Sequence, residues 1–176
     1  VPFSGRDEER DLAWGLLRAT GDGVPRALLI EGPSGCGMSR LAEWLCCRAE
    51  ETGQAIALRA AHSRQGSVRD GLPGLVARHL RVPVGLDQVG LARWVDRACE
   101  VEAIGDAGRL VELLSPTEAG RLVRADERHA LLERFVRSVG RDRRVIVWLD
   151  DAQWGADALA FANGLLRAVG LQALIV

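Results

Sequence analysis

The chain has 176 residues, of which 23 are basic and 24 acidic, so its formal net charge is −1, and 48% of it is hydrophobic. This length fits one domain with an ordinary core, and the balanced charge argues against a dedicated nucleic-acid-binding protein. No apolar run reaches the ~18 residues of a membrane span. Every basic residue is an arginine, a bias that a GC-rich genome explains.

The two ends and the cysteines indicate where the protein is located and whether the chain is part of a longer polypeptide. No charged-then-apolar leader opens the sequence, so we expect a cytoplasmic protein. The missing initiator methionine and the apolar end at Val176 predict that residues 1–176 form one domain of a longer polypeptide. The four cysteines have neither metal-ligand spacing nor the pattern of a disulfide framework.

The first third of the chain alternates helical and strand patterns. Leu12, Leu16 and Leu17 have helical spacing, and a Gly/Pro-rich break follows them. The apolar run 27–31 predicts a buried parallel strand. A glycine-rich turn then leads to a predicted helix at 39–51 and a second strand at 54–60.

The remainder predicts a long helical region followed by two more strands. Residues 67–140 are helical in pattern, with the clearest apolar stripe at 125–139. A third strand at 144–150, a helix at 157–169 and a fourth strand at 173–176 complete the order. The pattern predicts a three-layer α/β/α fold with a mainly parallel sheet and a helical insertion between the second and third strands.

The turn after the first strand has the spacing of a phosphate-binding P-loop. Gly32, Gly35 and Gly37 stand where backbone amides turn inward around phosphate oxygens, and Ser39 follows where a hydroxyl ligates Mg²⁺. The helix that begins there adds its positive dipole end. The predicted nucleotide-binding segment also includes Cys36, Met38 and Arg40.

Met38 occupies the position at which a P-loop carries its lysine. Methionine has a similar length but neither charge nor donor. The loss of one charge-assisted phosphate contact costs roughly 1.5–3 kcal/mol, or roughly ten- to hundredfold in affinity. Transition-state stabilisation would fall on the order of 10²–10³ in rate, by analogy with an oxyanion donor.

The third strand ends in two acids, Asp150 and Asp151, as in a Walker B motif. The first acid would hold Mg²⁺ together with Ser39, and the second would orient or activate the attacking water. Both motifs then fall at the carboxyl ends of parallel strands, where open α/β sheets bind ligands. We therefore predict Asp150 as a metal ligand and Asp151 as the catalytic residue.

Two further segments carry a family resemblance. The run from Phe3 to Glu8 resembles the hydrophobic-Gly-Arg-Glu opening of the STAND branch of AAA-type ATPases, and the run from Leu149 to Trp154 resembles its Asp-Asp-x-His/Gln-Trp signature. The resemblance implies an ATP/ADP-switched signalling domain, as in LuxR-type regulators, kinase or cyclase fusions and NLR-like proteins. It places Gly5 and Arg6 against adenine and ribose.

The chain departs from that family pattern at two places. One is Met38. The other follows Trp154, where the family usually has Ala-Asp and this chain reads Gly155-Ala156-Asp157. Rescue of the missing charge by Arg40 is disfavoured, because its side chain should leave the helix in another direction.

These observations predict a regulatory module that binds ATP or ADP with Mg²⁺ and hydrolyses it weakly or not at all. The resemblance further implies self-association and a fused or associated effector domain. Two alternatives stay open: an active ATPase whose lysine was deliberately replaced by Met38, and a nucleotide-free scaffold. Nucleic-acid binding through arginine-rich helix faces, such as that of Arg121, Arg124 and Arg128, is the weaker hypothesis, because acidic residues are interspersed.

Overall fold

The four strands form one all-parallel sheet in the order β1-β4-β3-β2. The structure is a computed structural model that describes residues 5–65, 70–116 and 124–176. Its strands are β1 (Arg26–Ala27), β2 (Ala55–Ala61), β3 (Arg144–Asp150) and β4 (Ala173–Ile175). Phe3, Ser4, Ser67 and Arg121, which entered the sequence interpretation, lie outside the described residues.

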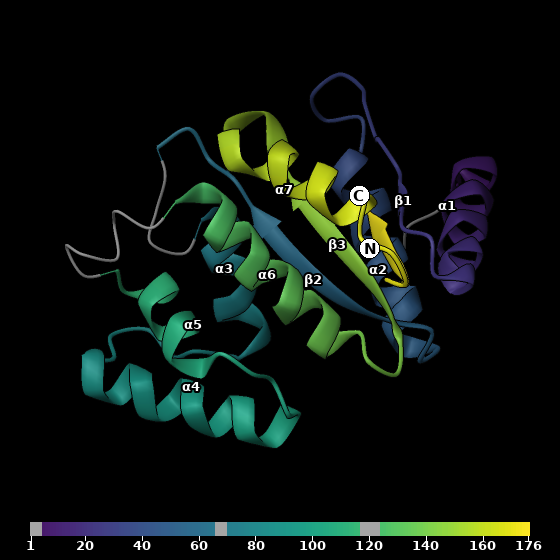
Figure 1. The fold of residues 1–176 in the computed structure, drawn as a ribbon. Helices are drawn as coiled ribbons and strands as arrows, with labels where there is room; N and C mark the ends of the chain where they lie inside the picture. Colours follow the sequence, from purple (N-terminus) through teal and green to yellow (C-terminus); the bar gives the residue numbers. More distant parts are fainter. Residues whose placement is uncertain (1–4, 66–69, 117–123) are drawn as a thin grey trace.

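Helices cover both faces of the sheet, as the three-layer prediction requires (Figure 1). One face packs against α1 (Asp7–Ala19) and α2 (Met38–Glu51) through a core that includes Leu17, Leu45 and Ile146. A larger core fills the other face, beneath α3 (Gly71–His79), α6 (Ala125–Val139) and α7 (Ala156–Leu166).

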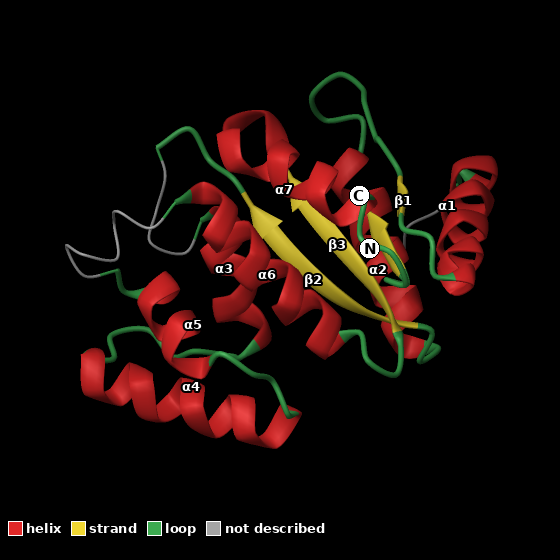
Figure 2. Ribbon diagram, in the orientation of Figure 1, coloured by secondary structure: helices red, strands yellow, loops and turns green. Residues whose placement is uncertain are grey.

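The helical insertion between β2 and β3 consists of α3, α4 (Gln88–Glu102), α5 (Ala107–Leu114) and α6. Figure 2 shows α4 and α5 packed outside α3 and α6, away from the strands. Short 3₁₀ turns, η1 (Thr20–Asp22) and η3 (Ala152–Trp154), complete the described elements. Within these residues, no helix combines the length and apolar composition that crossing a lipid bilayer requires.

The first strand is shorter and more exposed than the apolar run 27–31 predicted. Among the described residues β1 pairs with β4 alone, and the bond that follows the paired residues runs from the Leu28 amide to the Ile175 carbonyl. Beyond that point Leu29 is 78% exposed. The prediction of a buried strand at 27–31 was therefore wrong, because β1 covers only Arg26–Ala27 and neither residue is buried.

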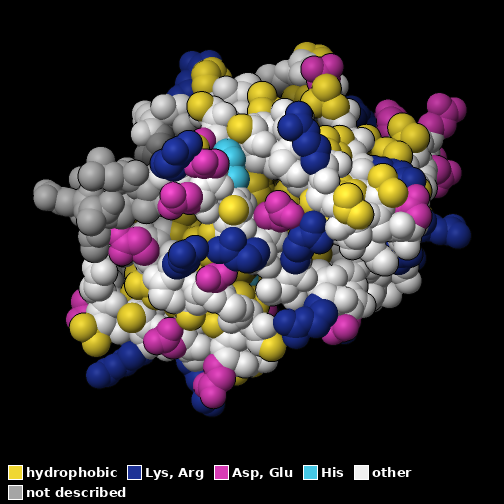
Figure 3. Space-filling model, in the orientation of Figure 1, with side chains coloured by type: hydrophobic (Ala, Val, Ile, Leu, Met, Phe, Trp, Pro, Cys, Tyr) yellow, Lys and Arg dark blue, Asp and Glu magenta, His cyan; other side chains and the backbone are white. Residues whose placement is uncertain are grey.

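The face seen in Figure 3 carries arginine and acidic side chains side by side rather than a separate basic patch. On α6, Arg128 pairs with Asp157 at 2.8 Å and Arg134 with Asp106 at 2.7 Å. These pairs join α6 to α7 and to the residue that precedes α5. The arginines of this face therefore tie helices together as well as meeting solvent.

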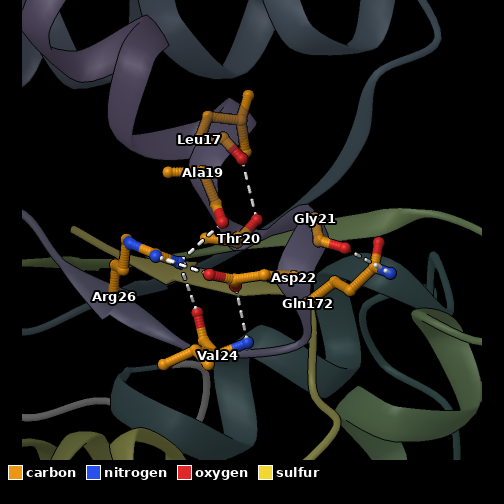
Figure 4. A network of polar contacts seen from close by, with 8 residues as sticks. All are labelled: Leu17, Ala19, Thr20, Gly21, Asp22, Val24, Arg26 and Gln172. Atoms are coloured by element: carbon orange, nitrogen blue, oxygen red, sulfur yellow. Dashed lines mark hydrogen bonds and ion pairs between the residues drawn. The ribbon is translucent and has the colours of Figure 1, made fainter.

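A compact polar network fixes the turn between α1 and β1 (Figure 4). The Arg26 guanidinium donates to both carboxylate oxygens of Asp22 and to the carbonyls of Ala19 and Val24. Asp22 also accepts from the Val24 amide. The side-chain bond from Arg26 is the main reason why the pKa of Asp22 falls from its usual 3.8 to about 2.

This network predicts a specific acid sensitivity. Because the pKa of Asp22 is lower in the folded chain, its contribution to stability is present above pH 3.8 and is lost as the pH falls through about 2. Asp22→Asn should lower the melting temperature at pH 7 and flatten its decline between pH 4 and pH 2. Melting curves across that range test this, and an unchanged acid slope in the variant would contradict it.

Candidate functional site

A cleft of about 530 Å³ opens at the carboxyl ends of the strands, between the loop that precedes α2 and helix α7. This volume is in the range of small-molecule sites. Its apolar walls include Leu29, Leu159 and Leu166. The polar groups of its lining come from three segments of the chain: Glu31, Ser39, Asp150, Asp151, Gln153 and Asn163.

The loop that precedes α2 has the backbone form that its glycines predict. Gly35 and Gly37 have φ values of +82° and +89°, a region that glycine enters without steric cost. Gly32 is required for another reason, since a Cβ there would lie 2.7 Å from the Cys36 sulfur. The loop therefore passes close to its own start and then leads directly into α2, whose first residue is Met38.

Met38 points into this loop. It lines the cleft and is half-buried, and a Cβ at position 32 would lie 3.6 Å from its Sδ atom. The side chain thus covers the first glycine of the loop with an uncharged thioether. The one lysine position of the motif is occupied here by a group that cannot pair with a phosphate.

Ser39 and Asp150 meet at the end of β3. The Ser39 hydroxyl donates to Asp150 Oδ1 at 3.1 Å, across 111 positions of sequence. Hydroxyl and carboxylate oxygens suit Mg²⁺, which keeps several waters and takes few protein ligands beside substrate phosphates. The described residues hold no group of three or more His, Cys, Asp or Glu side chains suited to a metal. The residues present fit a Mg²⁺ held by Ser39 and Asp150 together with phosphate oxygens.

The opening segment lies against the same loop. Arg6, the residue before α1, has a left-handed backbone with φ +57° and follows Gly5 at φ +78°. Its guanidinium Nη2 donates to the carbonyl of Cys36 inside the loop. The opening segment, which only the family resemblance connected with the loop, is thereby in direct contact with it.

Comparison with known proteins gives a match to a protein family. The family model described as AAA ATPase domain matches residues 2–176. The chain belongs to this family. No curated protein and no solved structure matches it. Membership of the AAA ATPase domain family suggests nucleotide binding, usually with Mg²⁺, on a P-loop α/β/α fold.

The second acid of this AAA ATPase domain, Asp151, lines the same cleft as Ser39 and Asp150. Asp151 is exposed and adopts a left-handed backbone with φ +56°, which is strained for a residue with a side chain. Its Oδ1 accepts from the Gln153 amide at 3.0 Å, and both residues line the cleft. Arg40, on α2, is exposed and lies outside the cleft lining, although it has an interaction of its own.

Arg59 was missed by the sequence interpretation. Its guanidinium stacks over the Trp148 ring at 3.9 Å, and Nη2 pairs with Asp150 Oδ2 at 2.5 Å. The signal was a single charged residue inside the otherwise apolar strand 54–60. The strand register, which sets Arg59 opposite Trp148, decides what that charge reaches.

The sequence interpretation also missed His62, which contacts the backbone at the end of β3. Its amide donates to the Asp150 carbonyl at 3.0 Å, and its ring Nδ1 lies at the same distance from that oxygen. The buried ring packs so tightly that a Cβ on Gly155 would lie 2.3 Å from His62 Cδ2. A side chain at position 155 would therefore collide with this histidine, whereas glycine leaves it room.

We expect Gly155→Ala to destabilise the chain by about 1–3 kcal/mol, the usual cost of overpacking. The backbone at Gly155, with φ −109°, suits alanine, so the cost is steric. Denaturant unfolding measures it. Gly164→Ala in α7 is the matched control, because a Cβ there meets nothing within 4 Å. In a His62→Ala background, Gly155→Ala should cost much less than it does in the wild type, and an equal cost in both backgrounds would contradict the steric explanation.

Proposed function

We propose that this AAA ATPase domain is an ATP/ADP-binding regulatory switch module of the STAND type, within a signal-transduction protein. The observation that carries the proposal is the convergence of two distant segments on the loop and the start of α2. Arg6 donates to the Cys36 carbonyl, and Ser39 donates to Asp150 at 3.1 Å. A loop that serves only as a strand-to-helix connection needs neither contact.

The roles of the site residues follow from their positions. The amides of the loop around Gly32, Gly35 and Gly37 would surround the phosphates, with Cys36, Met38 and Arg40 flanking them. Ser39 and Asp150 would hold Mg²⁺. Asp151, with its strained backbone and its bond to Gln153, would orient the attacking water. Gly5 and Arg6 would contact the nucleoside.

Weak hydrolysis follows from the charge of the site. Met38 covers the loop where a lysine would meet the transferred phosphoryl group, and a thioether provides no counter-charge for it. Binding depends on many backbone amides and suffers less than turnover does. A module that retains nucleotide without consuming it quickly suits a switch between two nucleotide states.

Calorimetry with Mg·ATP and Mg·ADP tests binding. We expect saturable binding below millimolar nucleotide, tightened about ten- to hundredfold by Met38→Lys, since that change restores one charge-assisted contact. Phosphate release should rise on the order of 10²–10³ in the same variant. Met38→Leu, which changes shape without adding charge, is the control. Absence of binding at millimolar nucleotide would favour a nucleotide-free scaffold.

The second acid gives an independent test of turnover. In the Met38→Lys background, Asp151→Asn should remove most of the gained phosphate release while nucleotide affinity changes less than about threefold, because Asp151 acts on water rather than on the phosphates. Comparison of binding and turnover in the same variants measures this. Equal turnover with and without Asp151 would reject its catalytic role.

Self-association and an effector complete the proposal. Nucleotide exchange would be coupled to assembly of several copies and to a fused or associated effector domain in the cytoplasm, with residues 1–176 as the nucleotide-binding domain. The molar mass in solution with ADP and with a non-hydrolysable ATP analogue tests this coupling. We expect a larger species with one nucleotide, and the same mass with both would exclude nucleotide-driven assembly of this domain.

A further inference from the structure

The carboxylates at the cleft pose an electrostatic problem for a polyphosphate ligand. Glu31, Asp150 and Asp151 all line the cleft, and the loop lacks its lysine. A bound nucleotide adds more negative charge to the same place. A counter-charge must then come from Mg²⁺ or from an arginine, since the chain has no lysine.

Arg59 lies directly behind the most enclosed of these carboxylates. In the register of β2 and β3, Arg59 is paired with Trp148. Trp148 stands two positions before Asp150 and on the same face of β3. The side chain runs across the Trp148 ring and forms an ion pair with Asp150 Oδ2, while Ser39 donates to Oδ1. Both oxygens of Asp150 thus have partners within the protein.

The ion pair does more than join two strands. β2 and β3 are already paired over seven positions, from Ala55 with Arg144 to Ala61 with Asp150. The Asp150 side chain is only 15% exposed, so its charge would be costly in that position without a partner. Arg59 also leaves its own Nε buried without a partner among the described residues. Arg59 thus neutralises Asp150 through Nη2, while its Nε donor stays without a hydrogen bond among the described residues.

We propose that Arg59 is the resident counter-ion of the phosphate site, holding the charge on Asp150 that Mg²⁺ would otherwise neutralise. The inference rests on the nucleotide-binding function proposed above and specifies its metal dependence. With Arg59 in place, nucleotide binds with little need for Mg²⁺. Without Arg59, the bare carboxylate repels the phosphates, and Mg²⁺ becomes necessary to restore binding.

Calorimetric titration of ADP in EDTA and in Mg²⁺ tests the inference on the whole chain. We expect the wild-type affinity to differ less than about threefold between the two conditions. Arg59→Gln should bind ADP at least about tenfold more weakly in EDTA, as expected for an unneutralised charge a few ångströms from a phosphate. Addition of Mg²⁺ should bring that variant back to within about threefold of the wild type.

Arg78→Gln is the matched control. Arg78 lies on α3 and donates to the carbonyl of Arg59 at 3.0 Å. The variant therefore removes one positive charge next to β2 and leaves the ion pair between Arg59 and Asp150 in place. Its ADP affinity should change less than about threefold in both conditions. A double variant isolates the electrostatic cause. Once Asp150→Asn has removed the carboxylate charge, Arg59→Gln should cost less than about threefold in EDTA.

Three results would overturn the inference. One is equal ADP binding by Arg59→Gln and the wild type in EDTA, and another is an equal loss in EDTA and in Mg²⁺, which indicates a structural role. The third needs no variant: a wild type that binds ADP at least tenfold more weakly in EDTA than in Mg²⁺. This third result leaves the proposed switch function intact, whereas absence of wild-type binding in both conditions removes the two together.

Discussion

The backbone and side chain of Asp150 form the point on which the site depends. One oxygen of its carboxylate accepts a hydrogen bond from Ser39 and the other accepts one from Arg59. Its backbone carbonyl lies within hydrogen-bond distance of the His62 ring. These partners come from α2 and from β2 and the residue after it, which only the parallel register of β2 and β3 brings to one place. A shift of that register by one residue would turn Asp150 and Arg59 to opposite faces of the sheet.

The absence of lysine has a structural counterpart in how the arginines are used. Arg10 stacks on Trp44, Arg59 on Trp148 and Arg64 on Trp154, with guanidinium-to-ring distances between 3.9 and 4.4 Å. A planar guanidinium can lie on a ring and still donate at its edge, as Arg59 does to Asp150. An ammonium group is a point charge and cannot do both with the same geometry. The composition that first indicated only genome bias therefore also permits this way of holding a carboxylate.

Local patterns predicted the elements well, and long-range pairing decided the rest. The structure has β3 at Arg144–Asp150 and α6 at Ala125–Val139, the bounds that the apolar runs predicted, because burial of one strand or one stripe is a property of the segment itself. The glycines of the loop before α2 also predicted its turn correctly, since their spacing alone indicates it. Strand 27–31 was overpredicted, because an apolar run does not by itself show where strand pairing ends, and β1 covers only Arg26–Ala27. Arg59 and His62 were missed because each acquires its role from a residue about 90 positions away.

The position of the charge has a consequence for what the site can do with a nucleotide. Met38 lines the cleft, whereas Arg59 lies outside its lining and reaches Asp150 from the β2 side. A cation behind a carboxylate lowers the electrostatic cost of admitting phosphates, but it makes no contact with the phosphoryl group whose charge changes in the transition state. Ground-state binding and transition-state stabilisation, which one lysine serves together, are then separated in space. Under the proposed function, such a site would favour retention of nucleotide over turnover, the property that distinguishes a switch from a motor.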